Sequence, residues 1–155
     1  MEKIPLMLNE ANKIFRNSDH LAYMTYPLIR DNKLLVRIAE NLSEALTRFM
    51  EVVLYYDRLY KRIGPYPENF RSKFEIFKTK CARRYGFEPR HLKIIQELKE
   101  FVEGRKKSSM EFVRDNKYFV AGYDYKMKSL DITQLKKYIN ESKEFVRKVN
   151  SIFPK

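Results

Sequence analysis

Apolar residues recur in alternating steps of three and four along the stretch from Asp31 to Ile63. This spacing places them on one face of an α-helix. The first row is Leu35, Ile38, Leu42, Ala45, Phe49, Val52, Tyr56, Leu59 and Ile63, and a second row beside it is Ala39, Leu46, Val53 and Tyr60. Two rows make the apolar face wide enough to contact several partner helices. We therefore predict a long helix that is either the central rod of a bundle or part of an oligomer interface.

Local signals mark the polar face and the ends of this helix. Asp57 and Lys61 have the i, i+4 order that stabilises a solvent-exposed helix face. Asp31 is the expected N-cap. Gly64 is expected to end the helix in the left-handed conformation.

Shorter apolar stripes precede the long helix. Residues 4–16 predict a first helix, and residues 21–28 predict a second helical piece. Residues 17–19 offer a break with a fresh N-cap between the two, and Pro27 ends or kinks the second piece. The pattern leaves open whether this part of the chain forms one kinked helix or two.

The pattern beyond the long helix is again mostly helical. Residues 68–85 predict one helix, and a further helix starts near Pro89 after a turn. A final helix runs to residue 152, with Asp131 as its N-cap and Gln134 at capping-box spacing. The sequence therefore favours helices packed side by side.

The segment between the last two helices departs from this pattern. Ser108 and Glu111 have capping-box spacing, which predicts a short helix over residues 109–115. Residues 117–128 are rich in aromatic residues and end in polar–apolar alternation, which predicts a small β-hairpin turning near Gly122. The expected fold is mainly all-α, a single domain over residues 1–155, with five to six helices bundled around one long central helix.

The composition limits the classes to which the chain can belong. Hydrophobic residues make up 44% of it, which excludes a disordered chain. The single cysteine, Cys81, cannot form an intramolecular disulfide, and its spacing from Phe74 and Phe77 places it in the core. The sequence has no apolar run long enough to cross a membrane and no secretory signal, so we expect a cytoplasmic protein without a membrane partner.

The formal net charge is +12, and the excess is concentrated in the middle of the chain. Residues 71–84 hold six basic residues and the single acid Glu75. Such a surface attracts phosphate-rich polymers, although a solvated basic face is the alternative. The predicted nucleic-acid-binding residues are Arg71, Lys73, Lys78, Lys80, Arg83, Arg84, Arg90, Lys93, Arg105, Lys106 and Lys107.

Tyrosines interleaved with lysines form a second feature. Tyr118, Tyr123 and Tyr125 have the composition of a platform on which single-stranded bases stack. The alternative is that they seal one end of the bundle.

The chain has two histidines, His20 and His91. Glu88 and His91 have the Glu-x-x-His spacing of di-metal bundles, but such sites need a second copy of the motif and two further glutamates. His20 follows Asp19 and is expected to lie near a helix cap. The sequence has no glycine-rich phosphate loop, Ser-His-Asp order or Cys-x-x-C pair. We therefore predict no metal and no cofactor.

The run Arg84-Tyr85-Gly86-Phe87-Glu88-Pro89-Arg90-His91 sets an arginine ahead of a histidine. With the helical architecture and basic surface, it resembles the HEPN superfamily of small helical proteins. Many members are metal-independent ribonucleases, or partners of nucleotidyltransferases in toxin–antitoxin pairs. The resemblance implies that Arg84 holds the scissile phosphate at a dimer interface while His91 moves protons for attack by the RNA 2′-hydroxyl. The alternative is a structural turn with an incidental surface histidine.

Three hypotheses about function follow. The leading one is a non-catalytic cytoplasmic protein that binds nucleic acid, with RNA slightly favoured because no helix-turn-helix with a clear recognition helix emerges. The second is an assembly protein, either a homodimer through the long helix or a complex with a protein partner, with incidental charge. The third is a HEPN-type ribonuclease that uses Arg84 and His91.

Overall fold

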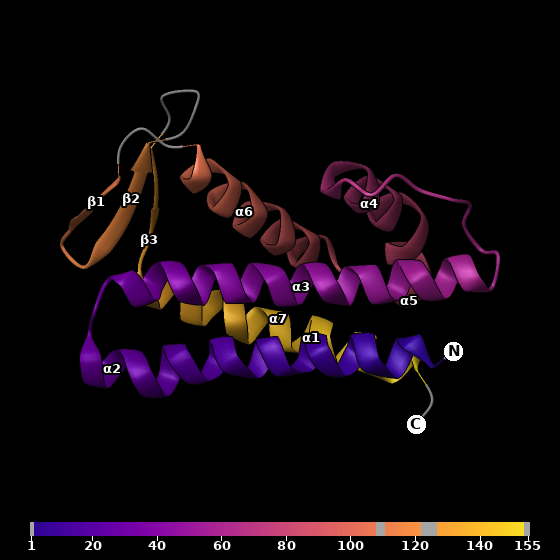
Figure 1. The fold of residues 1–155 in the computed structure, drawn as a ribbon, viewed down its shortest axis with the longest axis horizontal. Helices are drawn as coiled ribbons and strands as arrows, with labels where there is room; N and C mark the ends of the chain where they lie inside the picture. The colour runs from indigo at the N-terminus through magenta and orange to yellow at the C-terminus, as the bar shows by residue number, and fades with distance from the viewer. Residues whose placement is uncertain (1, 108–110, 122–126, 154–155) are drawn as a thin grey trace.

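A computed structural model describes residues 2–107, 111–121 and 127–153 of the chain. These residues form five continuous helical segments and one three-stranded antiparallel sheet. The chain begins and ends at the same end of the helical bundle, and the sheet lies at the other end (Figure 1). The prediction of a mainly helical bundle with a small β element is confirmed. No helix in the described ranges is long and apolar enough to cross a membrane.

The central element is α3 (Lys33–Leu59). It packs against α1, α6 and α7, so its two apolar rows are buried from Leu35 to Val53, while Leu59 and Tyr60 at its C-terminal end are exposed. The N-cap position is Asn32, one residue after the predicted Asp31, and the Asn32 side chain makes no capping hydrogen bond. Asp31 supplies that bond instead, because its Oδ1 accepts from the Lys33 backbone N–H at 2.9 Å. Of the two roles that the sequence left open, α3 takes that of the central rod.

The end of α3 differs from the prediction. The helix stops at Leu59, and Lys61 rather than Gly64 has the left-handed conformation, with φ 60°. The Arg62 N–H then donates to the Asp57 carbonyl at 2.8 Å. This tight turn folds Arg62 back over the last turn of the helix.

The N-terminal part of the chain is one continuous helix. It comprises α1 (Lys3–His20), a π-helical turn η1 (Leu21–Thr25) and α2 (Tyr26–Ile29). The predicted break at residues 17–19 is wrong, because Ser18 is buried and its Oγ donates to the Ile38 carbonyl at 3.2 Å. The π turn widens the helix just before Pro27, which has no N–H to donate.

The next segment repeats this construction. It comprises α4 (Phe70–Ile76), a π turn η2 (Phe77–Cys81) and α5 (Ala82–Tyr85), and it ends where Gly86 takes φ 70°. Asn69 caps it by accepting from the Ser72 N–H at 2.8 Å. The chain then enters α6 (Pro89–Lys106). This segment and α6 lie along one side of α3 (Figure 1).

The sheet contains β1 (Glu111–Arg114), β2 (Lys117–Ala121) and β3 (Met127–Leu130) in that order. The predicted short helix over 109–115 is wrong, because residues 111–114 are a strand. Asp115 and Asn116, with φ 52° and 61°, form the two-residue turn between β1 and β2, and these residue types tolerate that conformation. The predicted 117–128 hairpin is confirmed by the pairing of β2 with β3, while its turn near Gly122 lies outside the described residues.

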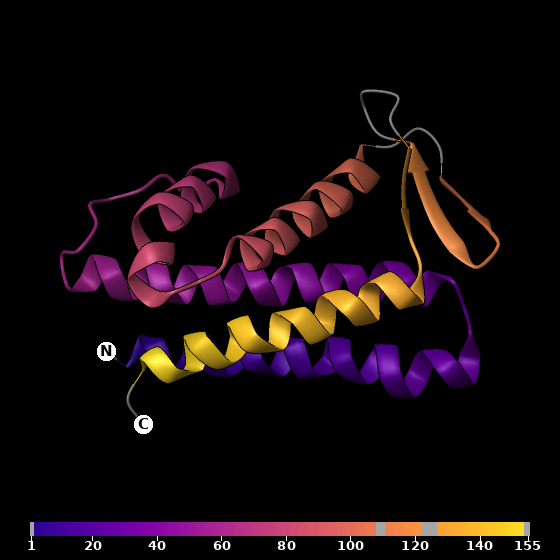
Figure 2. The same ribbon diagram turned by 180° about the vertical axis from the view of Figure 1, so that it is seen from behind.

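The last helix, α7 (Ile132–Ile152), crosses α1 and α3 on the face that Figure 2 turns toward the viewer. Its predicted N-cap is confirmed, since Asp131 Oδ1 accepts from the Gln134 N–H at 2.8 Å. The crossing brings α7 beside the turn between α5 and α6, where Lys148 Nζ donates to the Gly86 carbonyl at 2.7 Å. Two parts of the chain that lie 62 residues apart in sequence therefore meet at this point.

Candidate anion-binding site

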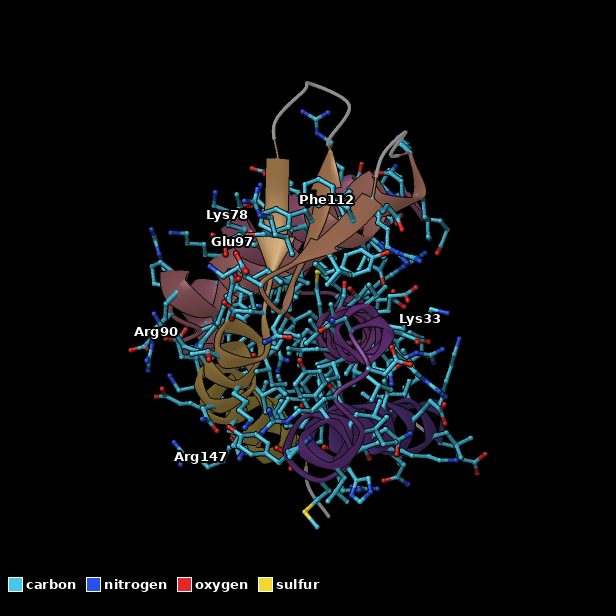
Figure 3. All side chains as sticks on the ribbon, turned by 90° about the vertical axis from the view of Figure 1, so that its left-hand side faces the viewer. Lys33, Lys78, Arg90, Glu97, Phe112 and Arg147 are labelled. Carbon is cyan, nitrogen blue, oxygen red and sulfur yellow. The ribbon has the colours of Figure 1, made fainter. Side chains whose placement is uncertain are left out.

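Most of the predicted basic residues fall into two groups in the structure. The first group projects from the α4–α5 segment into solvent and has no carboxylate within ion-pair distance in the described part of the chain. It consists of Arg71, Lys78, Lys80 and Arg83. Figure 3 shows Lys78 on the same flank of the molecule as Arg90 and Arg147, with Lys33 on the opposite flank.

The residues of the second group form ion pairs with glutamates. Lys73 is nearly buried and binds Glu68 at 3.1 Å, so it does not belong to an exposed patch. Lys93, Arg105 and Lys106 pair with Glu97, Glu111 and Glu103 at 3.7, 3.5 and 3.6 Å. Residues 105–107 also lie at the sheet end of α6, away from α4 and α5 (Figure 1). The eleven residues therefore do not make one continuous surface.

The carboxylate of Asp57 organises a different basic cluster. Asp57 lies in the last turns of α3 and is completely buried, so its predicted place on a solvated helix face beside Lys61 is wrong. Arg84 Nη1 lies 2.6 Å from Asp57 Oδ2, and Arg62 Nη1 lies 3.4 Å from Oδ1. The Tyr85 hydroxyl also donates to Oδ1. A buried carboxylate needs partners of this kind because its burial is otherwise costly.

Two groups that contact this carboxylate, the Cys81 thiol and the Tyr85 hydroxyl, have raised pKa values. Burial, followed by a hydrogen bond to Asp57, raises the pKa of the Cys81 thiol to about 12. The same two causes raise the pKa of the Tyr85 hydroxyl to about 12. Both groups therefore remain protonated donors at neutral pH, and Cys81 is a buried core residue, as predicted.

Above Asp57 opens a pocket of about 450 Å³. Its cations come from three elements: Arg62 follows α3, Arg84 lies in α5 and Lys148 lies in α7. The other lining residues are Tyr56, Tyr85, Ser151 and Ile152. Because these cations outnumber the one carboxylate beneath them, and Lys148 shares Glu144 with Arg90, the pocket is suited to an anion.

Packing orients the two guanidinium groups. The Arg62 guanidinium lies 5.3 Å from the ring centroids of both Tyr56 and Tyr60. Arg84 is held by its short bond to Asp57. About 37% of each arginine side chain's surface is exposed, so both can still contact a ligand. An anion would thus meet donors whose positions are set before it binds.

His91 lies below this surface, in contrast to the surface position considered from the sequence. Its side chain is 1% exposed, and its Nε2 lies 3.6 Å from Glu144 Oε2 and 3.8 Å from Glu88 Oε2. Neither ring nitrogen has a hydrogen-bond partner within the described structure. Burial, and then the nearby charge of Arg90, lower the pKa of His91. The imidazole is therefore neutral at physiological pH.

Glu88, His91 and Glu144 are close enough together to hold a metal ion. In this structure Arg90 satisfies their charge instead. Its Nε donates to Glu88 Oε2 at 2.7 Å, and its Nη2 donates to Glu144 Oε2. A metal ion would have to displace this guanidinium from both carboxylates.

The two residues of the HEPN-like motif have different surroundings. Arg84 lines the pocket and is bound to Asp57, whereas His91 is enclosed beside Glu144. Lys148 connects the two places, because it lines the pocket and lies 3.7 Å from Glu144 Oε1. His20 is exposed within the continuous N-terminal helix, so it does not lie near a cap as predicted.

The predicted tyrosine platform is wrong for Tyr118. Tyr118 is 9% exposed, and its hydroxyl donates to Glu111 on the inner face of the sheet. It cannot present its ring to a ligand in this conformation. Tyr123 and Tyr125 lie outside the described residues.

The sequence offered only part of the signal for the pocket. Arg84 was selected, but Arg62 and Lys148 were not, because they lie outside the densest basic run. Their meeting depends on the turn after α3 and on the crossing of α7. Comparison with known proteins gives no match: no family model, no curated protein and no solved structure is similar to this chain.

Proposed function

We propose that this chain binds the phosphate backbone of nucleic acid, with RNA favoured over DNA, and that it does so without catalysis. The observation that carries the proposal is the convergence of Arg62, Arg84 and Lys148 on one pocket above a single buried carboxylate. Guanidinium groups match the geometry of phosphate oxygens, and the neighbouring hydroxyls add neutral donors.

A polymer suits this surface better than a small anion does. Lys80 and Arg83 lie within about one helical turn of Arg84, and both are exposed with no ion pair in the described part of the chain. A backbone seated in the pocket would continue past these free cations. The net charge of +12 adds a long-range attraction for any polyanion.

The test is fluorescence anisotropy with short single-stranded RNA, duplex RNA and duplex DNA at three salt concentrations. The key variant combines Lys80→Glu and Arg83→Glu. The matched control combines Lys33→Glu and Arg37→Glu, which changes the net charge equally on exposed residues of α3; Lys33 lies on the flank opposite Lys78 in Figure 3. We expect the first pair to weaken binding roughly tenfold or more and the control to weaken it about twofold.

Two outcomes would contradict the proposal. Absence of binding to all three nucleic acids at low salt would leave the charge with a solvating role only. Equal losses in the two double variants would mean that the attraction is spread over the whole surface rather than located at α5 and the pocket.

Ribonuclease activity through Arg84 and His91 is assayed with the same samples. RNA recovered after incubation without metal is run on a gel. Cleavage that disappears in His91→Ala, while binding persists, would assign the activity. Because His91 is enclosed, cleavage would require the helix α6 to move or a ligand to open the site.

A second candidate function is assembly, and one observation favours it. Met24, Leu28 and Ile29 are 58%, 85% and 62% exposed at the end of the N-terminal helix. Such an apolar end suits contact with another protein or a second copy. Concentration-dependent mass in solution, abolished by Leu28→Lys, would support it. A cytoplasmic location and a homodimer through α3 also remain proposals; the apolar rows of α3 are buried from Leu35 to Val53 within the same chain.

A further inference from the structure

The sheet presents two phenylalanines on the face turned away from the helices. The strand register pairs Phe112 with Phe119, and Phe119 with Ser129. Tyr118 and Val120 alternate with Phe119 along β2 and are buried, and β2 packs against α6. Because neighbouring residues of a strand point to opposite faces, Phe112 and Phe119 must lie on the outer face. Figure 3 looks onto this end of the molecule and labels Phe112.

The two rings form an ordered aromatic surface. Their centroids are 5.0 Å apart, and their planes differ by 11°. Neither ring belongs to or packs on the hydrophobic core of the described residues. The aromatic pair therefore adds little to the interior, and part of each ring remains accessible to solvent.

Positive charge surrounds this surface. Arg114 and Lys117 pair across β1 and β2, two residues from the phenylalanines, and so stand on the same outer face. Their side chains are 79% and 50% exposed, and their nearest carboxylates in the described structure are at 4.0 and 3.9 Å. No acidic residue points outward from the described parts of these two strands.

The position of the sheet is set from its inner face. Glu111 lies 3.5 Å from Arg105 Nε at the end of α6, and it accepts a hydrogen bond from the Tyr118 hydroxyl. This network attaches β1 and β2 to the helix. It leaves the aromatic pair on the opposite face of the sheet, where each phenylalanine is partly exposed.

We propose that this outer face, formed by Phe112 and Phe119 with Arg114 and Lys117, is a binding site for the unpaired bases of single-stranded RNA. The inference rests on the nucleic-acid binding proposed above and deepens it. Bases of a single strand stack on aromatic rings, while neighbouring cations hold the phosphates. In a duplex the bases are already stacked and paired, so a duplex gains nothing from the rings.

The distance between the two sites is set by α6. The pocket lies beside Gly86, just before α6 begins, and the sheet follows its last residue. An 18-residue helix is about 27 Å long at 1.5 Å per residue. A strand that contacts both sites therefore needs roughly eight nucleotides if it keeps the rise of about 3.4 Å per phosphate of a stacked strand, and fewer if it is extended.

The test replaces both rings while keeping their apolar character. The double variant Phe112→Leu with Phe119→Leu removes the aromatic faces, and Phe112→Tyr with Phe119→Tyr keeps them. We expect the leucine variant to lose roughly tenfold to a hundredfold in affinity for single-stranded RNA of about twelve nucleotides. The tyrosine variant should bind within about threefold of the natural chain, and duplex RNA should bind all three proteins alike.

The outcomes distinguish base stacking on the sheet from phosphate binding in the pocket. Unchanged single-strand affinity in the leucine variant would overturn the platform while leaving the phosphate pocket in place. Absence of binding to any nucleic acid by the natural chain would overturn both. Circular dichroism and thermal unfolding of each variant check that the sheet is retained. If the double leucine variant unfolds, the test uses the single variants Phe112→Leu and Phe119→Leu, each of which should lose part of the affinity for single-stranded RNA.

Discussion

The two ends of α6 carry opposite kinds of surface. At the start of the helix, the pocket is built on a completely buried carboxylate, and its cations are anchored by three separate elements. At the other end, the aromatic pair stands on a small sheet, outside the hydrophobic core. The first surface is part of what stabilises the fold, whereas the second is an addition to it. Substitutions in the first surface should therefore cost more stability than substitutions in the second.

The largest expected effect tests whether the pocket is integral to the fold. Asp57→Ala removes the acceptor for Arg84, Tyr85 and Cys81. We expect the free energy of unfolding to fall by about 3 kcal/mol, measured by urea denaturation, because buried donors and a guanidinium lose their partner. Glu44→Ala is the control, since it breaks the exposed pair with Arg48 at 3.0 Å and should cost under about 0.5 kcal/mol.

The same experiment on the sheet sharpens the contrast. The leucine variants of Phe112 and Phe119 should lower the free energy of unfolding by about 1 kcal/mol or less, since the pair is outside the core. A loss as large as that in Asp57→Ala would mean that the sheet stabilises the helical bundle as much as the buried carboxylate does, which contradicts the difference between the two ends of α6.

Alkaline pH should lower the free energy of unfolding through the groups buried beneath the pocket. The folded-state pKa values of Cys81 and Tyr85, both about 12, lie above their ordinary values of 9.0 and 10.0. The folded state therefore holds more protons than the unfolded state between pH 9 and 12, and stability must fall as the pH rises through this window. Urea denaturation at several pH values measures the fall. Cys81→Ser, which does not titrate there, should reduce the fall to the part that Tyr85 contributes.

The smallest expected effect distinguishes charge from stacking. Lys148→Gln removes one cation from the pocket, so the slope of log affinity against log salt should decrease by about 0.7 for single-stranded RNA. The leucine variant of the sheet should lower affinity without altering that slope. A change of slope in the sheet variant, or none in Lys148→Gln, would contradict the assignment of phosphate binding to the pocket and base stacking to the sheet.

Much of the fold follows from local sequence signals. The apolar spacing of α3, the cap at Asp131 and the β2–β3 hairpin are all encoded within a few residues of where they occur. Where prediction failed, a local signal had two meanings. Ser108 and Glu111 matched a capping box, yet Asp115 and Asn116 form a hairpin turn that places Glu111 in a strand.

The site was less predictable than the fold. Asp57 has a lysine four residues later and matches a solvated helix pair, but its partner in the structure is Arg84, 27 residues away. The basic run over 71–84 holds Lys73, which turns inward, and lacks Lys148, which α7 brings beside Arg84. Density of charge along the chain therefore did not indicate which cations share a surface.

The sequence by itself determined the excess of positive charge, which is a matter of composition. It also determined the helical class, the central rod and the cap of the last helix, because each depends on residues within one or two turns of one another. Only the tertiary structure decided that Asp57 is buried, that Arg62, Arg84 and Lys148 meet, and that Phe112 faces outward. These features arise when segments distant in sequence are packed together. Burial then selects, among several local possibilities, the partners that satisfy each charge and hydrogen bond.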